Sequence, residues 1–196
     1  MKNILIGFLG LLMLGFTTHS SDYKIASYLI QGNSKLGIKG TTNVSRFNCD
    51  LAFSDINTKV KTFYKREGNK IKFIDSQLEL SNSCFDCGSK MINNDFLKML
   101  DTKNHPNITL ELKEITINPR ETSEIIALTN INIAGVSRYY SIWLNVDKSK
   151  SLNATGCLSL KLSDFKLEPP KKVLGLVVVE DEIEIALDLN ITALSK

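Results

Sequence analysis

Apolar and polar residues alternate with a period of two along most of the chain. The clearest run covers residues 183–191, where every odd position holds Ile or Leu and every even position holds a charged, polar or small residue. This alternation is typical of an antiparallel strand with one buried face and one face in water. The apolar residues 177–179 precede this run, and Glu180, Asp181 and Glu182 lie between the two. We therefore expect a terminal hairpin with an acidic turn.

Shorter runs with the same period predict further strands. The alternation changes phase at Lys113 and Glu114, which predicts a β-bulge or a bend at that point. The pattern gives about eight or nine strand candidates in total. Among them are the runs at residues 36–40, 108–112, 125–133, 140–146 and 158–162.

Residues 89–100 break the alternation. Their apolar side chains fall at positions 91, 92, 96, 97 and 100, a spacing that places them on one face of a short amphipathic helix. Pro106 follows closely and ends the helical segment. Regularly spaced antiparallel strands with a single helix predict an all-β barrel or sandwich that forms one domain.

The first twenty residues have the pattern of a secretory signal. Lys2 precedes an uncharged apolar run at residues 4–16, and the small residues Thr18 and Ser20 follow it. As a helix this run would be about 20 Å long, which is too short for a bilayer core of about 30 Å. We expect residues 1–20 to be cleaved and residues 21–196 to reach the periplasm or the outside of the cell. No later stretch has the length of a transmembrane helix, so we expect no membrane span after cleavage.

Export changes how the four cysteines are interpreted. In an oxidising compartment Cys49, Cys84, Cys87 and Cys157 predict disulfides, and three complete pairings exist. Cys84 and Cys87 also form a CxxC motif, which suits a redox pair or half of a metal site. The sequence lacks the βαβ context that a redox pair would need, and it lacks the extra ligand pair that a metal site would need. Structural disulfides are therefore favoured. The pairing Cys84–Cys87 with Cys49–Cys157 is the simplest, although the sequence does not fix it.

Composition and motif content exclude several classes of protein. Hydrophobic residues make up 43% and charged residues 23% of the 196 positions, which argues against a disordered chain. The net charge of +3 is scattered, so we expect no nucleic-acid partner. The two histidines have no metal-ligand spacing, and GxSxG, Walker A and GxGxxG motifs are absent from the sequence. We therefore expect neither a metal site nor an enzyme.

Four short motifs follow one another in a particular order. They cover residues 34–40, residues 105–108 directly after the expected helix, residues 131–137, and residues 164–170. In this order they resemble the YceI family of exported lipocalin-like proteins. The resemblance extends over nearly all of residues 21–196.

This resemblance implies an extended eight-stranded antiparallel barrel with one short helix. It also implies an elongated apolar cavity that holds a long-chain lipid, namely a polyprenoid or a related amphiphile such as an isoprenoid quinone. It brings no catalytic residue and no other cofactor. The side chains expected to line the cavity are Leu36, Ile38, Phe96, Leu100, Ile131, Ile133, Tyr140, Ile142, Leu144, Leu160, Phe165, Ile185 and Leu187.

The residues by themselves leave alternatives open. A packed core and an apolar cavity use the same side chains, so a filled, disulfide-pinned barrel that acts as an envelope interaction or stress module is a second interpretation. A thiol exchanger at Cys84 and Cys87 is a third. A homodimer is one assembly compatible with each of them. His105 is a candidate for a hydrogen bond to a ligand head group, and Arg138 is a candidate for pairing with a phosphate head. The neighbouring aromatic residues Tyr139, Tyr140 and Trp143 are candidates for lining the mouth of the cavity.

Overall fold

The structure is a computed structural model that describes residues 23–55, 58–149, 151–169, 171–172 and 177–194. The expected signal peptide, residues 1–20, lies outside the described residues. Strands dominate the part of the chain that is described, together with one α-helix and three short 3-10 helices.

The elements follow one another in an order that matches the alternation in the sequence. They are β1 (Lys24–Ile30), β2 (Lys35–Thr42), β3 (Arg46–Leu51), η1 (Phe53–Asp55), β4 (Lys59–Glu67), β5 (Lys70–Ile74), β6 (Gln77–Ser81), η2 (Asn82–Cys84), β7 (Phe85–Asp86), α1 (Lys90–Met99), β8 (Asn107–Ile117), β9 (Glu124–Ile133), β10 (Val136–Asp147), β11 (Leu152–Lys161), η3 (Leu162–Phe165), β12 (Lys171–Lys172) and β13 (Val177–Leu194).

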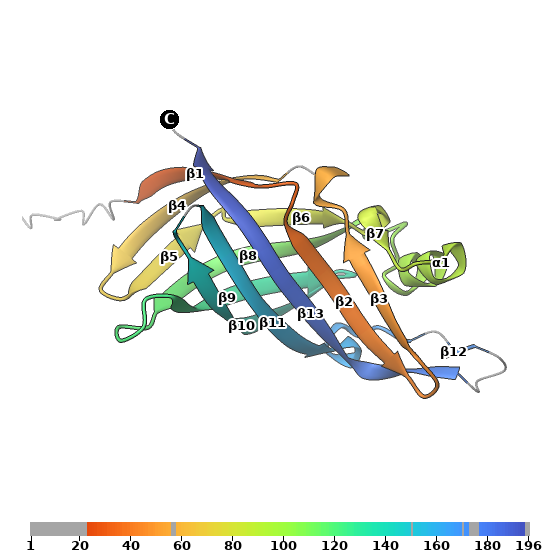
Figure 1. The fold of residues 1–196 in the computed structure, drawn as a ribbon. Coiled ribbons are helices and arrows are strands. Elements are labelled where there is room, and N and C mark those ends of the chain that lie inside the picture. Colours follow the sequence, from red (N-terminus) through yellow and green to blue (C-terminus); the bar gives the residue numbers. More distant parts are fainter. Residues whose placement is uncertain (1–22, 56–57, 150, 170, 173–176, 195–196) are drawn as a thin grey trace, which may run out of the picture.

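Eight antiparallel strands form a closed ring (Figure 1). Their order is β1, β4, β5, β8, β9, β10, β11 and β13, and pairing of β13 with β1 closes the ring. Strands β2, β3 and β7 extend from β13, while β6 shares β8 with β5. The expected all-β fold with eight antiparallel strands and one short helix is therefore confirmed.

Strand β13 is continuous over 18 residues, so the expected hairpin turn at residues 180–182 is wrong. The strand instead changes register against β2 between Val179 and Ile183. Asp181 lies in this irregular stretch, and its carboxylate accepts hydrogen bonds from Ser163 N at 2.7 Å and Ser163 Oγ at 2.6 Å. The acidic cluster thus marks a bulge stabilised by a distant serine. The start of β13 pairs antiparallel with β12.

The expected irregularity in β8 is confirmed. The register of β8 against β9 shifts between Leu112 and Glu114, where the alternation in the sequence changes phase. On its other side β8 pairs with β6 before this point and with β5 after it. Lys70 Nζ lies 2.7 Å from Glu114 Oε1 and joins β5 to the second half of β8. The bulge therefore bends the wall where one partner strand replaces another.

Helix α1 lies at one end of the ring and matches the expected helix (Figure 1). Ser89 caps it, since Ile92 N donates a hydrogen bond to Ser89 Oγ at 3.3 Å. The buried ring of Phe96 packs 5.3 Å from the ring of Phe85 on β7. The apolar face of the helix is thereby fixed against the strands at this end.

A two-residue turn between β9 and β10 depends on a glycine. Ala134 and Gly135 have φ values of 48° and 78°, as two-residue hairpin loops require. A Cβ atom on Gly135 would lie 2.7 Å from Cε1 of His105. The imidazole of His105 thus packs directly against the turn.

We predict that Gly135→Ala destabilises the protein by about 2 to 4 kcal/mol, because backbone strain and a clash with His105 add together. Gly68→Ala is the matched control: Gly68 has a φ of 64°, but a Cβ atom there would meet nothing within 4 Å. We expect the control to lose only about 1 kcal/mol. Urea denaturation measures both values, and equal losses would contradict the proposed role of His105.

Candidate functional site

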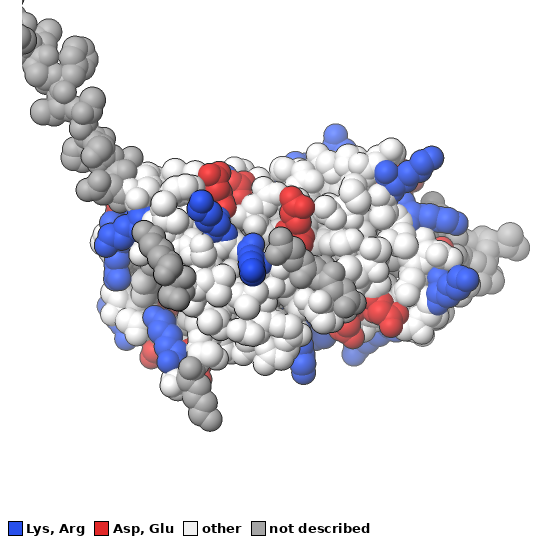
Figure 2. All heavy atoms as spheres, turned by 90° about the horizontal axis from the view of Figure 1, so that it is seen from above, with Lys and Arg blue, Asp and Glu red and all other residues white. Residues whose placement is uncertain are grey.

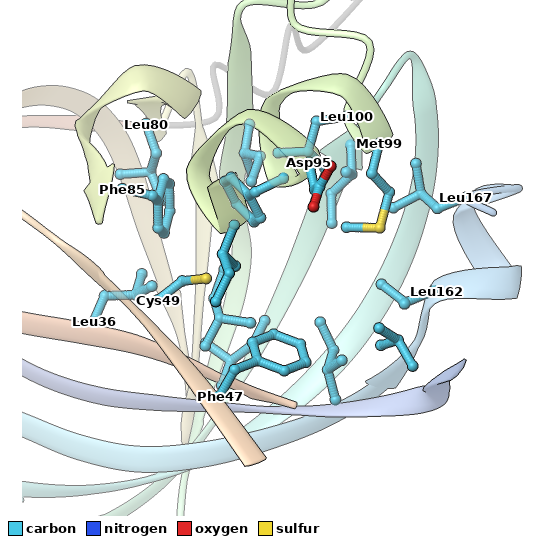
Figure 3. A pocket seen from close by; sticks show the side chains of 18 of the residues that line it. Leu36, Phe47, Cys49, Leu80, Phe85, Asp95, Met99, Leu100, Leu162 and Leu167 are labelled. Carbon is cyan, nitrogen blue, oxygen red and sulfur yellow. The ribbon is translucent and has the colours of Figure 1, made fainter. Parts of the chain in front are cut away.

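An apolar cavity of about 460 Å³ lies inside the wall beneath α1 (Figure 3). Strands β2, β3, β6 to β11 and β13 contribute its walls, and α1 contributes side chains from above. This volume is within the range of cavities that hold one small ligand. The inward positions of the strands thus enclose open space as well as packed core.

The structure places most of the expected lining residues on this cavity. Those on the lining are Leu36, Ile38, Phe96, Leu100, Ile131, Ile133, Ile142, Ile185 and Leu187. The other four, Tyr140, Leu144, Leu160 and Phe165, lie outside the lining. Leu160 and Phe165 are instead part of the packed core, with exposed fractions of 3% and 1%.

A packed cluster explains why Tyr140 and Phe165 do not reach the cavity. The short helix η3 follows β11 and brings Phe165 against Tyr140, with ring centroids 6.1 Å apart. The Tyr140 hydroxyl donates a hydrogen bond to Asp164 Oδ2 at 3.1 Å. Burial, and then the hydrogen bond and charge of Asp164, raise the pKa of Tyr140 to about 12. Alternation predicted that Tyr140 points inward but gave no sign that η3 covers it.

The cavity also has lining residues that are not among the expected ones. Two signals were available: Ile108, Leu158 and Ile183 lie at apolar positions of predicted strand runs, and Ile92 and Met99 lie on the same apolar helix face as Phe96. Strand β3 is short, and its alternation was too brief to be recognised as a strand. The residues missed are Thr42, Val44, Ser45, Arg46, Phe47, Cys49, Leu80, Phe85, Met91, Ile92, Asp95, Met99, Ile108, Leu110, Leu158, Leu162, Leu167, Val179 and Ile183.

Charge is nearly absent from the lining. Among the described lining residues, only Arg46 and Asp95 are charged. Arg46 is exposed at the start of β3, and Asp95 is half-buried on α1, where Figure 3 shows it beside Met99 and Leu100. Such a cavity favours an apolar ligand, since a polar group inside would lose its hydrogen bonds with water.

Phe47 lies flat on the floor of the cavity because its cross-strand neighbour is a glycine. Phe47 pairs with Gly40 in the β2–β3 ladder. A Cβ atom on Gly40 would lie only 2.2 Å from Cζ of Phe47. The missing side chain therefore lets the ring rest on β2, and a larger residue at position 40 would push the ring into the cavity (Figure 3).

One disulfide joins Cys49 on β3 to Cys87, three residues before α1. The expected pairing of Cys84 with Cys87 and Cys49 with Cys157 is therefore wrong. Cys157 is exposed on the outer face of β11, opposite Trp143, whereas Cys49 faces the cavity, so these two cannot meet. Cys84 and Cys157 are outside the disulfide. The bond holds the entry of α1 against the cavity wall.

The remaining candidates for head-group contact lie away from the cavity. Tyr139 and Trp143 face outward from β10 with exposed fractions of 63% and 64%. Arg138 donates a hydrogen bond to the carbonyl of Ser137, and His105 packs on the β9–β10 turn. None of these side chains lines the cavity described above.

Two further features were searched for in the described part of the chain. No group of three or more His, Cys, Asp or Glu side chains suited to a metal ion occurs among those residues. Within the same residues, no helix has the length and apolar character needed to cross a membrane.

Comparison with known proteins identifies the family. A family model described as YceI-like domain matches residues 31–191. The chain belongs to the YceI-like family. The resemblance inferred from the order of the short motifs is thereby confirmed.

Solved structures similar to this YceI-like chain support the fold. BcnA from Burkholderia cenocepacia is 19% identical, with a TM-score of 0.55 over 81% of this chain and 96% of that one. A polyisoprenoid binding domain from Saccharophagus degradans is 13% identical, with a TM-score of 0.62 over 87% of this chain and all of that one (100%). A search of curated protein sequences found no match. At these identities the likeness shows a shared fold.

We predict that Tyr140 is among the last tyrosines of this YceI-like protein to ionise. Its raised folded-state pKa contributes stability that is fully present below the ordinary tyrosine pKa of about 10. This contribution is lost as pH rises toward about 12. Ultraviolet absorbance titration and denaturation between these two pH values measure the effect. Asp164→Asn removes the acceptor charge and should lower the pKa of Tyr140. An unchanged titration would contradict the contribution assigned to Asp164.

We predict that reduction of the Cys49–Cys87 disulfide, which spans 38 positions of sequence, lowers the free energy of unfolding by about 2 to 4 kcal/mol. Denaturation of Cys49→Ala/Cys87→Ala measures this loss without any reductant. Cys84→Ser/Cys157→Ser is the control and should keep its sensitivity to reductant. Peptide mapping that recovers a Cys84–Cys87 bond instead would contradict the assignment.

Proposed function

We propose that this protein binds a long-chain apolar lipid of the isoprenoid class in the cavity and holds or carries it. The observation that carries the proposal is an apolar cavity of about 460 Å³. Among its described lining residues, only Arg46 and Asp95 are charged. Membership of the YceI-like family supports it. The similar Saccharophagus degradans structure, described as a polyisoprenoid binding domain, supports the ligand class. In this proposal the protein is a binding protein and not an enzyme.

The physical basis of the proposed affinity is burial of hydrocarbon. Each methylene equivalent moved from water into an apolar site contributes about 0.8 kcal/mol. Branched prenyl units would contact side chains such as Ile131, Ile142 and Leu158, which are themselves almost fully buried. Affinity should therefore rise with chain length until the cavity is full. A polyprenol and an isoprenoid quinone are both ligands of this kind.

The proposed place of action is the periplasm or the outside of the cell. The signal-like pattern of residues 1–20 supports export, as does the Cys49–Cys87 disulfide. Bound lipid would need a carrier there, since its hydrocarbon chain is almost insoluble in water.

A second candidate function is a ligand-free barrel that binds another envelope protein. The exposed side chains of Tyr139 and Trp143 on β10 favour this alternative, because aromatic side chains often anchor protein interfaces. The two functions differ in whether the cavity must stay open. The homodimer considered from the sequence remains an untested prediction.

We predict that native mass spectrometry of the protein purified from its own host shows a bound lipid of isoprenoid mass. The variants Leu158→Phe and Ile142→Phe extend ring atoms into the cavity and should each weaken binding of a fluorescent prenyl lipid about tenfold. Leu160→Met is the matched control, because Leu160 is buried on the same strand but outside the lining. Its affinity should match that of the natural chain.

Two results would contradict the proposed function. One is repeated absence of lipid from native samples together with no uptake of a prenyl lipid in vitro. The other is equal binding by the natural chain and by a well-folded Leu158→Phe/Ile142→Phe variant, which would place the lipid elsewhere.

A further inference from the structure

Exposed apolar side chains gather where the cavity reaches the surface. Large hydrophobic residues are exposed at only a few positions in the described chain, and Val44, Met91 and Val178 are three of them. Val44 and Met91 are 69% and 65% exposed, although both also line the cavity. They therefore form part of its rim. We call Val44, Met91 and Val178 the apolar rim.

The backbone holds the apolar rim in place. Val44 lies at the tip of the β2–β3 turn, where its amide and that of Ser45 donate hydrogen bonds to Thr42 Oγ1 at 3.2 and 2.9 Å. Val178 is tied to the same turn, because Asn43 N donates to Val178 O and Val178 N donates to Asn43 Oδ1. These contacts make the turn and the start of β13 one surface.

Met91 completes the rim from the first turn of α1. The helix, the β2–β3 turn and β12 lie at the same end of the molecule (Figure 1). The Cys49–Cys87 disulfide fixes the entry of α1 to β3, so both sides of the rim are anchored to one strand. The exposed side chain of Met91 is thus held in place on the rim by the helix and the disulfide.

Basic side chains stand beside the rim. Arg46 follows Val44 by two positions and is exposed, and Lys90 precedes Met91 and is also exposed. Figure 2 shows Lys and Arg side chains on the surface at this end of the molecule. The one acidic lining residue, Asp95, is half-buried on α1. Apolar residues flanked by Lys and Arg suit a bilayer interface, where the stems lie among acyl chains and the charges meet phosphates.

We propose that the apolar rim, with Arg46 and Lys90, is a docking surface for a lipid bilayer that carries anionic head groups. This inference rests on the proposed function, because the cavity behind the rim is the site assigned to the lipid. A bilayer is the partner that both holds such a ligand and matches the paired apolar and basic chemistry. Docking here lets a hydrocarbon chain pass between membrane and cavity without crossing water.

The experiment measures co-sedimentation of the full mature chain with vesicles of phosphatidylglycerol and phosphatidylcholine, against vesicles of phosphatidylcholine alone. We expect binding to the anionic vesicles that weakens as salt increases. Val44→Asp/Met91→Asp should reduce the partition coefficient about tenfold or more. Arg46→Ala/Lys90→Ala should reduce binding to the anionic vesicles and flatten its salt dependence.

Tyr139→Asp/Trp143→Asp is the matched control, since it also replaces two exposed large hydrophobic side chains with Asp. It should bind vesicles like the natural chain. Loss of binding in this control and not in the rim variant would overturn the proposal. So would absence of vesicle binding by the natural chain, or equal binding to both kinds of vesicle at all salt concentrations.

A second measurement keeps the proposal testable if the Val44→Asp/Met91→Asp variant, the rim variant, fails to fold. The sequence has one tryptophan, Trp143, which lies on β10 away from the rim. In a Trp143→Phe background, Val44→Trp should shift its emission to the blue with anionic vesicles, while Trp143 in the natural chain should not shift. The reverse result would overturn the docking assignment.

Failure of docking and failure of lipid binding are separable. Uptake of a short, water-soluble prenyl analogue is measured without vesicles. The variant Val178→Asp/Lys90→Ala changes the docking surface at two residues outside the cavity lining, so it should retain this uptake while its vesicle binding falls. A natural chain that takes up this analogue but ignores vesicles would overturn the docking surface alone. A chain that docks on vesicles but takes up no analogue would contradict the proposed function.

Discussion

Pairing between β1 and β13 closes the ring, and this closure determines what the interior can be. A closed sheet has no free edge at the junction, so every second side chain of each strand must point into a shared interior. In this chain those side chains are mostly Ile and Leu, and they fill part of the interior while leaving a cavity. The same constraint therefore produces the stable core and the candidate binding site.

The cavity persists because several contacts keep side chains out of it. Phe47 rests on the bare backbone of Gly40, and Tyr140 is held aside by Asp164 and Phe165. Helix α1 spans one end above the cavity and is tied to β3 through Cys49. The contacts of Tyr140 with Asp164 and of Cys49 with Cys87 join residues 24 and 38 positions apart, so the open space depends on the assembled fold.

Much of the architecture was predictable from the sequence, because period-two alternation and helical spacing act locally. The bulge at Glu114 and the helix that contains Phe96 were found in this way. The sequence predicts Asp181 in a turn, but it lies in a bulge because its partner Ser163 belongs to another element. The predicted pairing of Cys49 with Cys157 is wrong for a similar reason, because spacing along the chain does not show which cysteines face the same interior. In both cases the partner residue lies in another segment of the chain, so the local pattern does not identify it.

The closing seam of the ring joins residues 27–30 to residues 191–194, nearly the full length of the chain apart. A polypeptide still emerging from the ribosome lacks the second half of this seam until residues 191–194 are made. Such a nascent chain has an incomplete wall and cannot enclose a hydrocarbon tail. Any role that needs a closed interior is thus deferred until residues 191–194 are in place, and completing the seam depends on contacts of high sequence separation, which are slow to form.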